Sequence, residues 1–256
     1  MARGGILALG VAAIAAAGFY VTGATPLDSD ALAGLGGDPA KGKTVFIASG
    51  CASCHAAPEA KGDAKLVLSG GQKFPSDFGT FIAPNISPHP EAGIGSWTLS
   101  EFASAVTKGV SPEGQHYYPA FPYTSYQRMT DQDVVDLWAY WQTLPADATP
   151  SQPHEVGFPF NIRRSLGGWK LLYLDDDWMV ASAETHELER GRYLVEALAH
   201  CGECHTPRNP LGGLDTGNWL SGAPNPTGRG TIPSLRPDAL TWGPTEIAYY
   251  TKGDSF

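Results

Sequence analysis

Two five-residue motifs contain every cysteine of this 256-residue chain: Cys51-Ala52-Ser53-Cys54-His55 and Cys201-Gly202-Glu203-Cys204-His205. In each motif two residues separate the thiols, and a histidine follows directly. This spacing is typical of c-type haem attachment, in which the thiols add to the two vinyl groups and the histidine ligates the iron. The sequence therefore predicts two covalently bound haem c groups, attached at Cys51, Cys54, Cys201 and Cys204 and ligated by His55 and His205.

Other uses of paired cysteines explain the sequence less well. A structural zinc site needs no histidine directly after each pair and rarely draws its halves from so far apart. A thioredoxin-like dithiol expects a strand-helix-strand setting that neither motif has. Two plain disulfides would leave the matching histidines as a coincidence.

The predicted fold class is all-α, with two tandem cytochrome c domains after an N-terminal transmembrane helix. One motif falls in each half, and the abundant Gly and Pro are expected where a cofactor fills the core. The formal charge of −9 argues against nucleic acid as a partner. The expected segments are a membrane anchor or signal segment (1–24), a tether (25–37), the first domain (38–145), a packed linker (146–188) and the second domain (189–256), incomplete at its C-terminus.

The N-terminal residues 5–23 carry no charged side chain, and as a helix they would span roughly 28 Å, nearly the bilayer core. Arg3 precedes this run and no charge follows before Asp28, so the rest of the chain should be exported. A cleaved signal peptide is the alternative, because the run is rich in Ala and Gly. Either way, the haem domains are expected in the periplasm, anchored to the inner membrane or released.

Two helices are expected to cross in the first domain. Asp38 followed by Pro39 predicts a helix start, after which Gly42 and Phe46 share one face. A second helix is predicted over residues 130–144, with an apolar stripe made by Val134, Leu137, Trp138, Trp141 and Leu144. Because glycine permits a close approach, this stripe should pack on the Gly42 face.

Met129 stands directly before that second helix and is the expected sixth ligand of the first haem iron. A thioether is a soft ligand that raises the reduction potential of an iron that only passes electrons. Of the three methionines, Met129 is the one between a haem motif and a closing helix. His116 is the rival ligand, and a core methionine is the structural alternative.

Further motifs accompany the cysteines. In the first half they are Gly70-Gly71, Phe78-Gly79-Thr80, Ala83-Pro84-Asn85-Ile86-Ser87, Gly93-Ile94-Gly95-Ser96-Trp97, Phe121-Pro122-Tyr123 and Met129-Thr130-Asp131. In the second half they are Gly191-Arg192-Tyr193-Leu194-Val195-Glu196 and Thr206-Pro207-Arg208-Asn209. With these motifs the chain resembles the membrane-associated cytochrome c subunits of bacterial alcohol, gluconate and aldehyde dehydrogenases over about residues 38–253. Some members of this family have three haem domains, and this chain has motifs for two.

The resemblance implies that a carbonyl near Pro58 and Pro207 accepts the Nδ1 hydrogen of each haem histidine, with simple turn prolines as the alternative. Several side chains are candidates to reach haem propionates, with packing or solvation as the alternative: Trp97, Tyr117, Tyr118, Tyr123, Arg163 and Arg164. Residues 158–174 are too apolar for a free linker and should pack across both domains. The run Asp175-Asp176-Asp177 is interpreted as a solvated acidic turn.

The two halves align loosely, since residues 83–88 match 231–237 and Gly109 matches Gly253. Met129 and a closing helix follow Gly109, but almost nothing follows Gly253. The second haem is therefore expected to lack a sixth ligand from its own domain, with Met179 of the linker as a weak substitute. A longer natural chain is the preferred explanation, ahead of a ligand from a partner subunit or a five-coordinate iron.

The preferred function is electron transfer from a periplasmic dehydrogenase to a terminal oxidase or another cytochrome of the respiratory chain. No Ser/His/Asp set, phosphate-binding loop or dinucleotide glycine pattern occurs in its proper context, so any catalysis would have to take place at a haem. Two alternatives stay open. They are a di-haem subunit of a terminal oxidase and a di-haem enzyme, such as a peroxidase or a thiosulfate-oxidising cytochrome.

Overall fold

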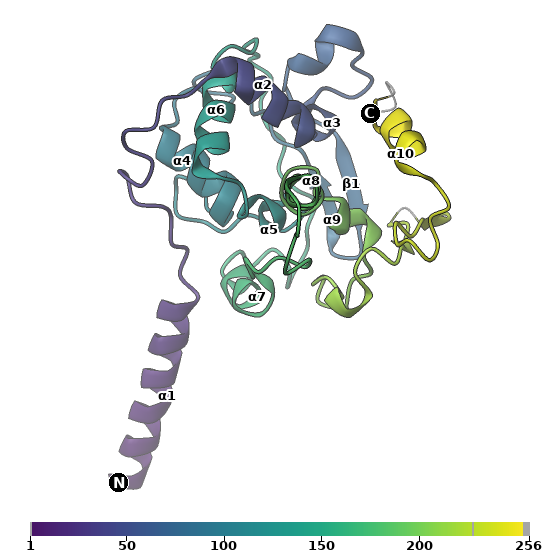
Figure 1. The fold of residues 1–256 in the computed structure, drawn as a ribbon. Coiled ribbons are helices and arrows are strands. Elements are labelled where there is room, and N and C mark those ends of the chain that lie inside the picture. Colours follow the sequence, from purple (N-terminus) through teal and green to yellow (C-terminus); the bar gives the residue numbers. More distant parts are fainter. Residues whose placement is uncertain (1, 227, 253–256) are drawn as a thin grey trace.

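The computed structural model describes residues 2–226 and 228–252. Helix α1 (Ala2–Val21) extends away from the body that holds both cysteine motifs (Figure 1). The expected transmembrane helix over residues 5–23 is wrong, because no helix in the described part of the chain is both long and apolar enough to cross a membrane. The run consists largely of Ala and Gly, and these small side chains offer little apolar surface per residue.

The first half consists of short helices around one small sheet. Its elements are α2 (Pro39–Ala48), α3 (Cys51–His55), the 3-10 helix η1 (Gly62–Leu66), β1 (Lys73–Ser76), β2 (Gly79–Ile82), α4 (Leu99–Ala103), the π-helical η2 (Ser104–Lys108), α5 (Tyr123–Tyr126) and α6 (Asp131–Trp141). The side chain of Asp38 caps α2 and that of Thr130 caps α6, which agrees with the sequence patterns.

The second half repeats part of this plan. After the linker helix α7 (Ser165–Tyr173), its elements are α8 (His186–Tyr193), the π-helical η3 (Leu194–Leu198), α9 (Cys201–His205), the 3-10 helix η4 (Thr216–Asn218), β3 (Ala223–Pro224), β4 (Thr231–Ile232) and α10 (Pro244–Lys252). At the start of α4, Glu101 accepts the backbone N–H of Thr98, and at the start of α10, Glu246 accepts that of Gly243. Gly253, the expected match of Gly109, lies outside the described residues.

The predicted all-α class is also wrong, because each half contains an antiparallel two-stranded sheet. In the first sheet Lys73 lies opposite Ile82, and in the second Ala223 lies opposite Ile232. The strands are four residues long in the first sheet and two in the second. Such short strands show no recognisable alternation of apolar and polar residues, so no sequence pattern revealed them.

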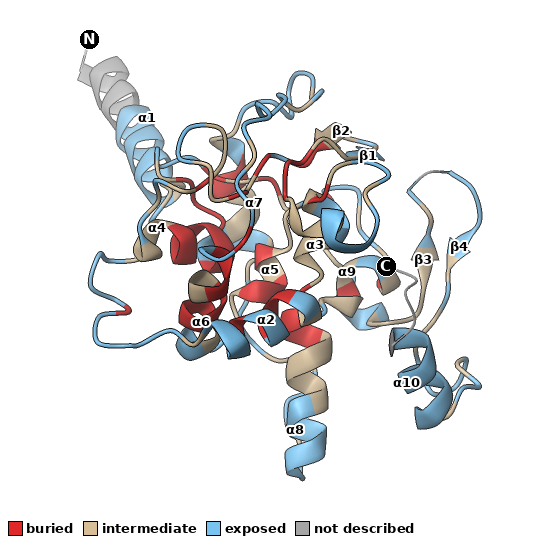
Figure 2. Ribbon diagram, turned by 90° about the horizontal axis from the view of Figure 1, so that it is seen from above, coloured by how far each residue is buried: buried red, intermediate tan, exposed pale blue. Residues whose placement is uncertain are grey.

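The buried core gathers around α2, α4, α5 and α6, whereas β3, β4 and α10 are more exposed (Figure 2). A Cβ built on Gly42 would lie 1.9 Å from the Asp136 carbonyl oxygen, so α2 and α6 cross in direct contact. Phe46 packs edge-on against Tyr140 and Trp141, with ring centroids 5.3 and 5.7 Å apart. The predicted crossing of these two helices is therefore confirmed.

The segment of residues 25–37 lies along the first half. Leu32 is buried in the core, and the Leu27 N–H donates to the Ser104 hydroxyl at 2.9 Å. The Gly36 carbonyl accepts the side-chain amide of Gln132 at 2.9 Å. The segment therefore packs against η2 and α6.

Helix α7 of the linker contacts both halves. Lys170 Nζ donates to the carbonyl of Gly109 in the first half, at 2.8 Å. Trp169 Nε1 donates to the carbonyl of Leu211 in the second half, at 2.9 Å. These two hydrogen bonds, made by neighbouring residues, tie the halves together through α7.

Candidate haem-binding sites

The first motif forms the single helical turn α3, directly after α2. Gly50 takes a left-handed conformation (φ 63°) that permits the reversal between the two helices. Cys51 and Cys54 are free thiols three positions apart, so they lie on the same side of the turn. Burial raises the pKa of Cys51 to about 12, and the neighbouring Cys54 adds to the rise. The environment therefore favours uncharged sulfur, as in the thioethers of a covalently attached haem.

His55 keeps its Nε2 available because the protein holds its Nδ1. Nδ1 lies 2.9 Å from the Pro84 carbonyl oxygen, and this contact favours the tautomer with the proton on Nδ1. The His55 carbonyl accepts the Gly70 N–H at 2.8 Å. Burial lowers the pKa of His55, against the opposing effect of the Pro84 carbonyl, so the ring is kept neutral. A neutral imidazole with a fixed Nδ1–H is a suitable iron ligand.

The second motif has the same arrangement. His205 Nδ1 lies 2.8 Å from the Pro233 carbonyl oxygen, and the His205 carbonyl accepts the Gly222 N–H at 2.8 Å. Gly70 and Gly222 have φ values of 74° and 88°. A Cβ on Gly70 would lie 2.5 Å from the Ala83 carbonyl oxygen, and a Cβ on Gly222 would lie 2.8 Å from the Ile232 carbonyl oxygen. Ala83 and Ile232 directly precede the two prolines. A frame of glycine, histidine and proline therefore occurs twice, as two haem sites require.

The acceptors of the histidine protons differ from the expected ones. The resemblance placed them near Pro58 and Pro207, which follow the histidines closely in sequence, whereas the carbonyls are those of Pro84 and Pro233. These two prolines lie in the segments that match between the halves. That internal match was the signal that could have identified them.

The two motifs lie on opposite sides of Tyr126, at the interface between the halves. Burial raises the pKa of Cys54, and Cys204 adds to the rise, so the two thiols are close enough to interact. Tyr126 lies between the motifs, because its hydroxyl donates to the Ser49 carbonyl at 2.7 Å and its ring packs edge-on against His200. Ser49 and His200 stand just before the first cysteine of each motif. Cys54 and Cys204 would therefore hold their haems near this interface.

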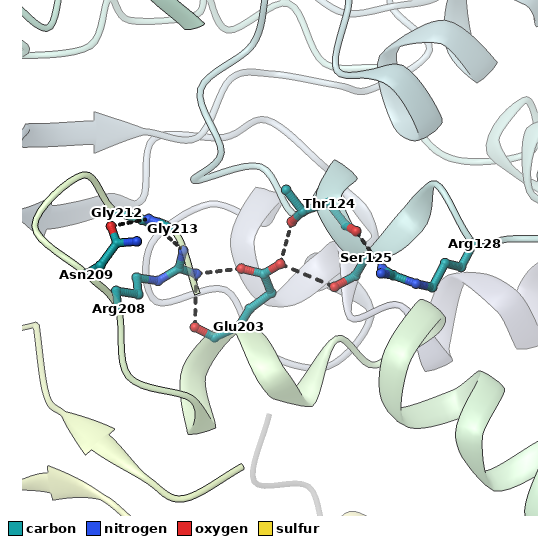
Figure 3. Close-up of polar contacts among 8 residues, drawn as sticks. All are labelled: Thr124, Ser125, Arg128, Glu203, Arg208, Asn209, Gly212 and Gly213. Carbon is teal, nitrogen blue, oxygen red and sulfur yellow. Dashed lines mark hydrogen bonds and ion pairs between the residues drawn. The ribbon is translucent and has the colours of Figure 1, made fainter. Parts of the chain in front are cut away.

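Glu203, inside the second motif, joins the second half to the first (Figure 3). Its carboxylate accepts hydrogen bonds from the hydroxyls of Thr124 and Ser125, the latter at 3.2 Å, and pairs with Arg208 at 2.5 Å. The side chain is 9% exposed, and a carboxylate so buried requires such partners. No sequence signal indicated this role, because the motif constrains only its cysteines and histidine.

Met129 is buried in the apolar cluster that Cys51 borders. His116, the rival ligand, has its Nε2 3.0 Å from the Thr22 carbonyl oxygen, while its buried Nδ1 has no hydrogen-bond partner among the described residues. Met129 remains the predicted sixth ligand of the first haem, because it lies in the cluster that the first cysteine of the motif borders.

Three of the six propionate candidates have polar or aromatic protein partners. Tyr118 and Arg163 donate to backbone carbonyls at 3.1 and 3.0 Å, and Arg164 lies 3.9 Å above an aromatic ring of α1. Among the described residues, the buried Tyr123 hydroxyl and the buried Arg164 Nε have no hydrogen-bond partner, as expected of groups that contact a bound molecule. Two further candidates, Trp97 and Tyr117, are partly buried.

The described residues give no support to the interpretations without haem. All four cysteines are free, so neither disulfide forms. Within residues 2–226 and 228–252, the one cluster of three potential metal-ligating side chains is the exposed run Asp175-Asp176-Asp177. The donor set at each motif is two thiols and one imidazole on a single helical turn, which suits haem c.

Comparison with known proteins agrees with these sites. Residues 39–145 match the family model of cytochrome c. A di-haem c-type cytochrome of Cereibacter sphaeroides is 54% identical over 235 residues, which cover 92% of this chain and 79% of the relative. The fructose dehydrogenase cytochrome subunit of Gluconobacter japonicus is 42% identical over 73% of this chain, and the alcohol dehydrogenase (quinone) cytochrome c subunit of Komagataeibacter europaeus is 34% identical over 83%.

The two motifs and the fold around them define a protein of the cytochrome c class. The chain belongs to the c-type cytochrome family, together with the di-haem cytochrome and the dehydrogenase cytochrome subunits. It spans 40% and 47% of the lengths of the fructose and alcohol dehydrogenase subunits.

Proposed function

We propose that this protein carries two haem c groups and relays electrons, one at a time, from a dehydrogenase to the respiratory chain. The link between the two motifs through Tyr126 carries the proposal, because the Tyr126 hydroxyl donates to the Ser49 carbonyl and its ring packs against His200. Electron transfer slows steeply with distance, and one tyrosine side chain bridges the residues that precede the two motifs. Cys54 and Cys204 would hold the two haems on either side of this bridge.

Each residue has a simple part in this relay. The bound haem iron supplies the one-electron chemistry. The cysteines hold each porphyrin, and the Pro84 and Pro233 carbonyls orient the imidazoles of His55 and His205. The buried side chain of Tyr126 fills the interface and keeps water from it.

The dehydrogenase partner is proposed from the relatives, which are named as cytochrome subunits of fructose and alcohol dehydrogenases. The acceptor is proposed to be a terminal oxidase or another cytochrome. A periplasmic location is part of the proposal, because export suits covalent haem attachment.

Oxygen uptake by cells that lack the chain tests this function. Fructose, a primary alcohol and gluconate serve as electron donors, and the strain is complemented with the wild type or with the double variant Cys201→Ala/Cys204→Ala. The relay predicts that uptake driven by at least one donor is lost, restored by the wild type and not restored by the variant. Equal uptake in all strains with every donor would contradict the proposed function.

A further inference from the structure

The loop that carries Met129 is held on both sides by residues of the second half. We propose that Glu203 and Tyr193 are positioning residues for Met129, so that the second half controls how firmly the first haem is ligated. This inference rests on Met129 being the ligand in the proposed relay.

The first contact lies before Met129 in the chain. Thr124 and Ser125 on α5 both donate their hydroxyls to Glu203 Oε1. The other oxygen, Oε2, pairs with Arg208, whose guanidinium also donates to the carbonyls of Glu203 and Gly212 at 3.1 and 2.8 Å. Arg208 thus holds the Glu203 carboxylate in the position where it accepts hydrogen bonds from α5 (Figure 3).

The second contact lies directly after Met129. The Thr130 N–H donates to the hydroxyl of Tyr193, the last residue of α8, at 3.1 Å. The same hydroxyl donates to Asp133 Oδ2 at 2.5 Å. Tyr193 therefore holds the first turn of α6, at the point where the chain leaves Met129.

A third contact comes from the linker. Arg128, next to Met129, donates from Nη2 to the carbonyls of Asp175 and Asp177 at 2.8 and 2.7 Å. Within the first half, the Met129 N–H bonds to the Tyr126 carbonyl at 2.9 Å. The loop thus has anchors in its own half, in the linker and in the second half. Loss of the second-half anchors should let Met129 leave the iron more easily.

Imidazole competes with methionine for ferric haem iron, so its apparent binding constant measures how firmly Met129 is held. Loss of one or two hydrogen bonds should weaken that hold by about fivefold to thirtyfold, the factor that about 1 to 2 kcal/mol represents. Imidazole titrations of the holoprotein, followed at the near-infrared methionine band, should show correspondingly tighter imidazole binding in Tyr193→Phe and Glu203→Ala.

Two further variants separate this effect from general damage. Ser125→Ala removes one hydrogen bond to Glu203 by a change in the first half, and it leaves the residues of the second half unchanged. It therefore tests the same contact should Glu203→Ala disturb the folding of the second half. Tyr173→Phe is the matched control, because the Tyr173 hydroxyl accepts from Asn209 at 3.2 Å and contacts none of the loop anchors. Imidazole binding in this control should stay within about twofold of the wild type.

The proposal is supported if Tyr193→Phe and either Glu203→Ala or Ser125→Ala tighten imidazole binding at least about fivefold. Constants that stay within about twofold in all three variants overturn it. A methionine band that survives Met129→Ala also overturns it, because the ligand would then be another residue. That last result leaves the two-haem relay standing, since oxygen uptake tests the relay independently.

Discussion

The variant Gly42→Ala tests the crossing of α2 and α6, on which the first haem site is built. The added Cβ would lie 1.9 Å from the Asp136 carbonyl oxygen and 2.8 Å from the Tyr140 Cβ. Both neighbours belong to α6, and one is backbone, so no side-chain rotation relieves the overlap. Helices α2 and α6 must move apart by more than about 1 Å to restore ordinary contact distances of about 3.5 Å.

The separation has two costs. Overpacking of this kind destabilises by about 1 to 3 kcal/mol. It also loosens the packing of Phe46 on Tyr140 and Trp141, and each such aromatic pair contributes about 0.5 to 1.5 kcal/mol. A total of about 3 kcal/mol lowers the thermal unfolding midpoint by about 10 °C in a chain of this size.

Far-ultraviolet circular dichroism of the holoprotein measures this midpoint. Gly191→Ala is the matched control, because Gly191 also lies within a helix but has no atom within 4 Å of the position that an added Cβ would occupy. There alanine should stabilise by about 0.5 to 1 kcal/mol through helix propensity. If Gly42→Ala left the midpoint as high as Gly191→Ala does, the close crossing of α2 and α6 would be refuted.

Two other changes have defined outcomes. Tyr126→Phe leaves the buried Ser49 carbonyl without its hydroxyl donor. Denaturant titrations should show a free energy of unfolding that is lower by about 1 to 2 kcal/mol. An unchanged value would mean that this hydrogen bond is not formed. Burial lowers the pKa of Lys170 from 10.5 to about 8, so between these pH values the unfolded chain binds more protons than the folded one. The free energy of unfolding of the wild type should therefore rise with pH across that window, and Lys170→Met should remove this part of the rise. The same slope against pH in both proteins would contradict the lowered pKa of Lys170.

The parts of the structure that the sequence predicted are set by local spacing. The caps at Asp38 and Thr130, and the faces of Gly42 and Phe46, follow from residue types at helical intervals. The haem motifs are likewise contiguous, so their chemistry is visible in five residues.

The parts that the sequence missed depend on contacts between distant residues. The Pro84 carbonyl reaches His55 only because a glycine with positive φ lets the intervening chain fold back. Glu203 and Tyr193 acquire their roles from the docking of the second half on α5 and α6, which no local pattern reports. The expected transmembrane helix failed for another reason, because the absence of charge in a run is not sufficient when its side chains are small.

The number of covalently bound haems tests the account most directly. The intact mass of the denatured holoprotein should exceed the polypeptide mass by two haem groups, and Cys51→Ala/Cys54→Ala should reduce the excess to one. A wild-type mass with one haem or none would contradict the two-haem relay.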